Sequence, residues 1–384
     1  LYNDFDENGD LINSTLRVDN EKEDELNEEY ELSYKKEFDK KGQELTALVQ
    51  YRNNSEGERS NLTEFDVMNM PTLDQRSAND ESEKQWLMQS DFILPLSSEG
   101  KFEAGYRGTI RDIKNDYLVE ELDENDIWQS LPGFSNNFNY EENIHAAYVM
   151  AGNRSGSWSY QAGLRAESTL IKTLLEQTNE FNQKEYINFF PSAFLTYELN
   201  KGQSVQASYS RRINRPRFRS LNPFSSFSDA RNIRTGNPDL DPELTDSYEL
   251  GYLLNYGTGN IYLGGYYRFT TDKIERVSFV DEDGITYSQP QNLSTENSYG
   301  IELNGSQDIG ENFSVNGNLN FFRSIINGSA NGEDLNADTY SMSGRISSIL
   351  KIPGWFETQL TGFYRAPQTV PQGTRKSLYS IDLG

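Results

Sequence analysis

Apolar and polar residues alternate along much of this chain, and that pattern predicts β-strands. Between residues 102 and 111 the even positions hold aromatic, aliphatic or small residues, whereas the odd positions include Glu103, Arg107 and Arg111. Residues 313–321 alternate in the same way, with Ser or Asn between apolar residues and Gly. Successive side chains of a strand point to opposite faces. Each segment therefore forms a strand with one apolar and one polar face.

Seven short polar turns separate these segments at intervals of about 50 residues. One longer acidic or Asn/Ser-rich segment lies between each pair of turns. The turns are at residues 39–43, 97–100, 153–156, 200–203, 257–260, 310–312 and 353–354. An outer-membrane barrel alternates short periplasmic turns with long external loops in this way. A soluble sandwich has no need to place all its short turns at one end.

The pattern predicts roughly fifteen antiparallel strands, joined by short turns on one side and long external loops on the other. Strands are expected at 28–38, 44–53, 84–95, 101–113, 139–152, 157–170, 184–199, 204–212, 244–256, 260–276, 296–309, 313–326, 339–351, 356–367 and 374–384. External loops are expected at 1–27, 54–83, 114–138, 171–183, 213–243, 277–295, 327–338 and 368–373.

Alternation alone would also fit a soluble barrel that buries its apolar face, but three observations favour a lipid-facing one. The polar faces carry charges such as Arg111, Glu249 and Glu302, which suit a wet lumen. Strands of about 10–14 residues are long enough for a tilted membrane crossing and exceed the average strand of a soluble protein. Trp158 and Trp355 follow short turns, where an interfacial aromatic girdle belongs.

Composition is consistent with one large β unit that covers residues 1–384. The chain has 23 Tyr, 21 Phe and 29 Gly, with no compositional shift along its length. No apolar run approaches the roughly 20 residues of a membrane helix, so a membrane protein of this sequence must be a closed barrel. A mean hydropathy of −0.77 is compatible with a barrel, whose lumen and loops are polar. No signal peptide opens the chain and no aromatic residue ends it, so we expect it to be incomplete at both ends.

The formal net charge of −25 argues against nucleic acid as a partner, because phosphates would be repelled. Residues 1–30 alone contain 11 Asp and Glu, against Arg17 and Lys22. The simpler interpretation is a solvated outer surface. The alternative is divalent-cation bridging to anionic surface glycans.

One segment is more specific than the strand pattern. It runs through Arg-x-x-Arg-Pro at residues 212–216, Asn-Pro at 222–223 and Gly-Asn-Pro-x-Leu-x-Pro-Glu at 236–243. The residues of the motif are Asn214, Pro216, Asn222, Pro223, Gly236, Asn237, Pro238, Leu240, Pro242, Glu243 and Glu249. This segment resembles the C-terminal barrel of TonB-dependent receptors, especially the outer-membrane β-barrel family common in Bacteroidetes. The resemblance covers essentially the whole chain.

The resemblance implies an all-β transmembrane antiparallel barrel of about 22 strands, of which this chain covers roughly fifteen. Such receptors import scarce nutrients such as ferric chelates, cobalamin, glycans or peptides. The implied partners are outer-membrane lipid, a plug domain of the same polypeptide that is not in this chain, and TonB. Surface lipoproteins or other outer-membrane subunits are further possible partners. The alternatives are a non-transporting barrel subunit of a surface assembly and a passive porin.

The loop at 213–243 is the one basic island of an acidic chain. Its prolines lock φ and remove donors, so we expect an ordered loop, and Gly236-Asn237 supplies residues that tolerate positive φ. In the functional interpretation, its arginines bind an anionic ligand such as a ferric chelate, because guanidinium groups match carboxylates and phosphates. In the structural interpretation, they pair with lumenal carboxylates such as Glu249, Glu167 and Glu302, or with the plug. The arginines are Arg211, Arg212, Arg215, Arg217, Arg219, Arg231 and Arg234.

Catalytic and metal chemistry have little support in the sequence. His145 is the only histidine and the chain has no cysteine, so we expect no transition-metal site. A Ser-His hydrolase needs a nucleophile–base pair, and one histidine, expected in a girdle or lumen position, makes it improbable. We therefore expect no catalytic residue, no metal and no cofactor.

Overall fold

The computed structural model describes residues 2–5, 8–224, 232–281, 284–330 and 332–384. Within these ranges, seventeen strands form one antiparallel sheet. Two of them are short: β1 (Tyr2–Phe5) pairs with β2, and β6 (Trp128–Ser130) pairs with β5. The other fifteen are long and pair in chain order, each with the next.

The long strands are β2 (Leu11–Glu37), β3 (Glu44–Phe65), β4 (Pro71–Pro95), β5 (Lys101–Leu122), β7 (Asn136–Ser155), β8 (Trp158–Leu175), β9 (Glu180–Asn200), β10 (Gln203–Asn214), β12 (Glu243–Tyr256), β13 (Gly259–Thr271), β16 (Thr295–Ile309), β17 (Phe313–Asn327), β20 (Ala337–Ile352), β21 (Phe356–Arg365) and β24 (Leu378–Leu383). The prediction of roughly fifteen strands is confirmed. The predicted bounds of the strands at the short turns are also confirmed, to within a few residues.

At the external side, the predicted bounds of several strands are wrong, because strand pairing continues far into the segments that were expected to be loops. The loop expected at 54–83 consists mostly of β3 and β4, which turn at residues 66–70. Likewise β2 occupies most of the loop expected at 1–27. Both faces of these extensions are mostly polar, with scattered apolar residues such as Val18 and Leu62, so the regular apolar alternation disappears while backbone pairing continues. Cross-strand ion pairs such as Arg59–Asp80, 2.8 Å apart, accompany the pairing.

The apolar faces of the strands point outwards, as predicted for a barrel in lipid. Leu250, Ile301 and Phe321 are 61%, 57% and 54% exposed. Arg111, on the polar face of β5, instead contacts Glu83 on the inner side. His145 lies on the outer face, where its Nδ1 is 2.7 Å from the Tyr106 hydroxyl. This arrangement fits the girdle position expected for the histidine.

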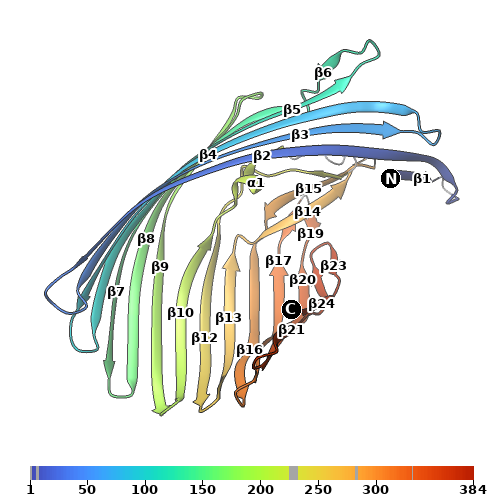
Figure 1. Cartoon of the computed structure of the whole chain (residues 1–384). Coiled ribbons are helices and arrows are strands. Elements are labelled where there is room, and N and C mark those ends of the chain that lie inside the picture. Colours follow the sequence, from blue (N-terminus) through green and yellow to red (C-terminus); the bar gives the residue numbers. More distant parts are fainter. Residues whose placement is uncertain (1, 6–7, 225–231, 282–283, 331) are drawn as a thin grey trace.

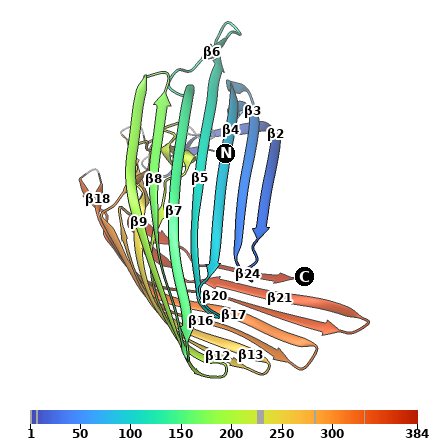
Figure 2. The ribbon, with the colours of Figure 1, turned by 90° about the vertical axis from the view of Figure 1, so that its left-hand side faces the viewer.

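The sheet curves into a deep trough, and the loops that carry α1, β14 and β15 fold into its concave side, whereas the loop with β6 projects beyond the ends of the strands (Figure 1). Seen from the side, the strands turn from upright at β2–β9 to strongly inclined at β20–β24 (Figure 2). Within the described ranges, β2 and β24 are not paired with each other. No helix of the described residues is long and apolar enough to span a membrane.

Short secondary structures occupy the loops that were expected to be irregular. The predicted strand at 260–276 ends earlier, at Thr271, because Asp272 takes a positive φ of 54°. The chain then forms the hairpin β14 (Ile274–Val280) and β15 (Thr286–Asn292), which β11 (Asn232–Arg234) joins as a third, parallel strand. Two smaller hairpins follow, β18 (Ser329–Ala330) with β19 (Glu333–Asp334) and β22 (Gln368–Val370) with β23 (Gly373–Arg375).

Candidate functional site

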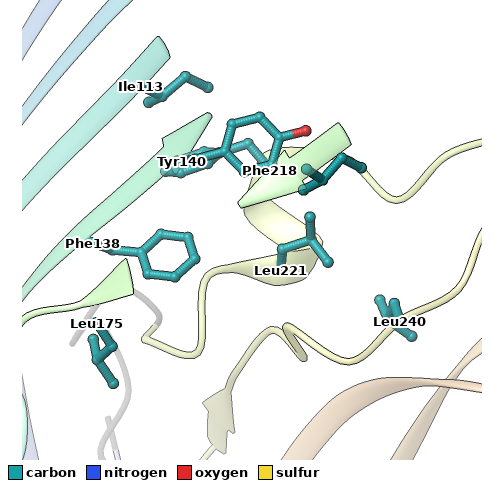
Figure 3. Packing of buried hydrophobic residues seen from close by; sticks show 8 residues of the cluster. Ile113, Phe138, Tyr140, Leu175, Phe218, Leu221 and Leu240 are labelled. Atoms are coloured by element: carbon teal, nitrogen blue, oxygen red, sulfur yellow. The ribbon is translucent and has the colours of Figure 1, made fainter. Parts of the chain in front are cut away.

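The loop between β10 and β12 folds inwards and packs on the inner wall of the sheet. Its short helix α1 (Phe218–Leu221) places Phe218 and Leu221 in a buried cluster, at 5% and 2% exposure. The Phe218 ring lies 5.7 Å from the rings of Phe138 and Tyr140 on β7 (Figure 3). Burying one such side chain contributes about 1.5–3 kcal/mol. The loop is therefore held by apolar contacts as well as by its prolines.

Asn222 fixes the chain where it leaves α1. Its side chain is buried and donates a 3.1 Å hydrogen bond from Nδ2 to Oδ1 of Asn115 on β5. Its Oδ1 accepts the backbone N–H of Phe224 at 3.1 Å. Pro223 between them is half-buried. The Asn-Pro part of the motif therefore connects the loop to the wall of the sheet.

Gly236 is required for close approach, not for positive φ, so the expectation for Gly236-Asn237 is wrong. Neither residue has a positive φ. A Cβ on Gly236 would instead lie 2.8 Å from the backbone N of Asn222 and closer still to its carbonyl oxygen. In the native structure, Gly236 N–H donates to that oxygen at 2.8 Å. The two halves of the loop are thus in direct backbone contact.

The second half of the motif closes the loop against β8 and β9. Asn237 accepts the N–H of Asp239 through its Oδ1 at 2.9 Å and donates from Nδ2 to the Pro290 carbonyl at 3.2 Å. Leu240 is 2% exposed in the buried cluster. An apolar crevice there is lined by Pro216, Pro238, Pro242, Leu221 and Leu240 of the loop and by Ile171 of β8.

Glu243 is the buried acceptor at the end of the motif. Its Oε2 accepts a 2.7 Å hydrogen bond from Asn214, and its Oε1 accepts the N–H of Ile274 at 2.8 Å. Lys273 Nζ lies 3.2 Å from Oε1. Burial alone would lower the pKa of Lys273, but the neighbouring Glu296, Glu243 and Glu275 raise it overall. Asn214 and Glu243 therefore tie β10, β12 and the start of β14 together.

The predicted arginine island does not form one site. Arg215 donates to Glu167 Oε2 at 2.6 Å and to Thr169 Oγ1 at 2.9 Å, in a largely buried position. It therefore has the structural role that was one of the two alternatives. Arg211 pairs in register with Asp246, which accepts a hydrogen bond from Tyr209, on the outer face.

The remaining predicted arginines differ in position. Arg212 is exposed on the inner face of β10, and Arg217, Arg219 and Arg234 are exposed on the inward loop. Arg231 lies outside the described residues. The pairing suggested for Glu249 is with Arg268, 3.6 Å away, and not with a loop arginine.

A cavity of about 570 Å³ separates the inward loop from the inner wall of β2–β5. Phe218, Asn222 and Gly236 form part of its loop side, so the motif shapes the cavity directly. The charged residues that line it from the loops are Arg219, Arg234 and Arg276, and from the sheet Asp19, Glu21, Glu58, Glu81 and Arg76. Arg76 is paired with Glu120 on β5, with 2.6 Å between Nε and Oε2. Arg276 of β14 was not predicted as a site residue.

The acidic wall was also missed, because its segments were expected to be loops. Cross-strand pairing aligns Glu25 with Glu56 and Glu56 with Glu81, in one row across β2, β3 and β4. Burial and the nearby Glu21 raise the pKa of Glu58, and burial raises the pKa of Glu81. The sequence signal was present, since Glu occupies every second position at 21–25, 56–58 and 81–83.

Comparison with solved structures finds the same fold in outer-membrane transporters. The chain is similar to the copper transporter OprC, with a TM-score of 0.59 and 13% identity over 89% of this chain and 56% of that one. It is similar to the ferric citrate transporter FecA, with a TM-score of 0.57 and 12% identity over 89% and 53%. It is also similar to the FrpB iron transporter from Neisseria meningitidis. The TM-score is 0.53 and the identity is 13%, over 94% of this chain and 64% of that one.

The chain thus spans between about half and two thirds of the length of these transporters. No curated protein matches it in sequence. Residues 36–384, which include all of the motif and nearly all of the sheet, match the outer membrane protein beta-barrel family. The outward apolar face and the up-and-down strand order agree with that match. The chain belongs to the outer membrane protein beta-barrel family and is a protein of the bacterial outer membrane.

Proposed function

We propose that residues 1–384 form part of the barrel of a TonB-dependent importer, with a plug domain elsewhere in the same polypeptide. The importer takes up a scarce nutrient, and the barrel contributes binding groups and no catalytic residue. The single observation that carries the proposal is the loop at 213–243. It is anchored inside the barrel and presents exposed arginines to a cavity.

A receptor gains affinity when its binding groups are held in place before the ligand arrives. Phe218, Asn222 and Glu243 hold the loop in this way, through the buried cluster and the hydrogen bonds to Asn115 and Asn214. A passive porin leaves its lumen open and has no need of such a device. The fold similarity to transporters of copper, ferric citrate and iron supports the same interpretation.

The test is to purify the native polypeptide from outer membranes, measure its intact mass, and assay binding to the periplasmic domain of TonB. We expect a mass well above 44.0 kDa, a domain ahead of Leu1, and co-purification with TonB. A mature protein near 44.0 kDa that does not bind TonB would overturn the proposal. If that protein also co-purified with fixed outer-membrane partners, a non-transporting subunit would replace the importer.

A further inference from the structure

The two walls of the cavity carry opposite charge. Arg219, Arg234 and Arg276 line it from the loops, and carboxylates of β2, β3 and β4 line it from the sheet, where the one arginine of the lining, Arg76, is neutralised by Glu120. Among the described residues, no ion pair joins the two walls. The charges of the two walls face a shared space and act on each other only at a distance, as Arg219 does on Glu81. A bound molecule that carries both charges would complement both walls at contact distance.

The acidic wall is rich in acceptors, although Asn79 donates to Glu58 and Ser60 donates to Asp19. Glu21, Glu58 and Glu81 line the cavity from three adjacent strands, and burial raises the pKa of Glu58 and of Glu81. Gln75, on the same wall, is only 6% exposed. Its Nε2 donates to Glu121 at 2.7 Å, while its buried Oε1 has no hydrogen-bond partner among the described residues. Buried acceptors of this kind favour a donor-rich cation such as an ammonium group.

The basic wall offers donors without a carboxylate. Arg276 is fixed by its Nη1, which donates to the Ser288 carbonyl at 2.8 Å and to the Thr235 carbonyl at 3.4 Å. Arg234 and Arg276 line the same cavity. Burial and the positive charge of Arg234 lower the pKa of Arg276. Guanidinium groups bind carboxylates through paired N–H donors. A carboxylate between them would relieve the repulsion.

We infer that this cavity binds a short peptide as a zwitterion. The α-ammonium group lies against Glu21, Glu58 and Glu81, and the α-carboxylate lies against Arg219, Arg234 and Arg276. The inference rests on the proposed function, because it names the nutrient class that the importer would bind. A volume of about 570 Å³ falls within the usual range for small-ligand sites, about 300–1,000 Å³.

A ligand of one charge sign would leave one wall uncompensated, as a purely anionic chelate would do at the carboxylates. In a single amino acid the ammonium and carboxylate groups are attached to the same carbon atom, so the two charges lie close together. A peptide instead separates its termini by about 3.3–3.6 Å per residue when extended. This property allows the two ends to reach opposite walls at the same time.

The test uses the full polypeptide, purified in detergent, and a random tripeptide library as the probe. Bound peptides are separated by gel filtration and quantified by mass spectrometry. Parallel libraries carry an N-terminal acetyl group or a C-terminal amide. We expect the free library to be retained, and each capped library to bind at least tenfold more weakly. No retention, or equal retention of all three libraries, would overturn the inference.

Variants assign each end of the peptide to its wall. The double variant E58Q/E81Q should lose discrimination against the acetylated library, and Arg234→Gln should lose discrimination against the amidated one. Glu99→Gln and Arg154→Gln, in short turns at the other end of the barrel, are matched controls that should bind as the native protein does. Unchanged discrimination in the cavity variants would contradict the assignment. Heat-dependent mobility in SDS gels checks that each variant is folded.

The binding assay needs no proton gradient and no TonB, so its outcome is independent of energised import. A protein that binds TonB but retains no peptide would overturn this inference and leave the proposed function standing. A protein that retains peptides as expected but does not bind TonB would support peptide binding and contradict the proposed TonB-dependent import.

Discussion

The side-chain amide of Asn214 donates a 2.7 Å hydrogen bond to Glu243 Oε2, directly across the ladder between β10 and β12. These residues begin and end the inward loop, so the bond closes the loop at its base. The other oxygen of the same carboxylate accepts the N–H of Ile274 and lies 3.2 Å from Lys273 Nζ. One buried carboxylate therefore fixes the relative position of two external loops.

Replacing Glu243 by Gln should loosen both loops. The charge that balances Lys273 is lost, although Glu296 remains 3.4 Å from Lys273 Nζ. We expect local destabilisation of about 1–3 kcal/mol, the usual penalty for disrupting a buried hydrogen bond to a charged group. Amide hydrogen exchange at residues 236–243 and 272–275 measures it. Glu357→Gln, which removes an exposed partner of Lys351, is the control and should leave exchange there unchanged.

Gly236→Ala should displace the loop, because the added methyl group has no space beside the Asn222 backbone. Since the conflict is with backbone atoms, a side-chain rotation cannot relieve it. We expect faster amide exchange at residues 218–224 and a smaller cavity for any ligand. Gly133→Ala is the matched control, since nothing lies within 4 Å of a Cβ at that position. Equal exchange in the two variants would contradict the close-approach explanation.

Phe218→Ala should detach α1 from the wall of β7. Truncation of a buried Phe costs about 3–5 kcal/mol, and here the loss falls on loop docking because the barrel ladders are untouched. Trypsin should then cleave at Arg217 or Arg219 much faster than in the native protein. Phe181→Ala removes an exposed Phe of the outer face and should not change the cleavage rate. Slow cleavage of both variants would mean that the loop is held without Phe218.

The acidic wall should become more stable as the pH falls from neutrality. In the folded protein the pKa of Glu58 and the pKa of Glu81 are raised above their ordinary value, mainly by burial. The folded state therefore binds protons more tightly than the unfolded one, and stability is gained as the pH falls through the raised pKa values. Amide protection factors, which are exchange rates corrected for the intrinsic pH dependence of each amide, should rise over that range at residues 54–60 and 78–83. In the E58Q/E81Q variant this pH dependence should be much smaller.

The outer face should reject charge at membrane level. Ile301→Arg places a guanidinium group in lipid, which destabilises a barrel by about 2–4 kcal/mol at the bilayer midplane. Asn304→Arg, three residues further along the same strand, faces the lumen and should be tolerated. Reversible unfolding in lipid vesicles compares the two. Similar stability of both variants would contradict the assignment of faces on β16.

The barrel and its lipid-facing side could be read from the sequence, because strand alternation is a local property. Residues 313–321 alternate through their own composition, and the short turns mark the periplasmic rim without help from distant residues. The motif at 236–243 was equally visible, although the reason for Gly236 was not. Glycine is required at position 236 because the backbone of Asn222 lies too close for a Cβ atom, and the two residues come together only in the folded loop.

The sequence by itself determined a β-barrel, the outward face of each strand and the location of the specific loop. Only the tertiary structure decided that Arg215 is committed to Glu167 while Arg219 and Arg234 face a cavity. It also decided that Glu58 and Glu81 lie on the opposite wall. The physical reason is that alternation is set by neighbours along the chain, whereas each charge finds its partner through strand register and loop docking. These join residues that are far apart in the sequence, by 48 positions for Arg215 and Glu167 and by 107 for Asn222 and Asn115.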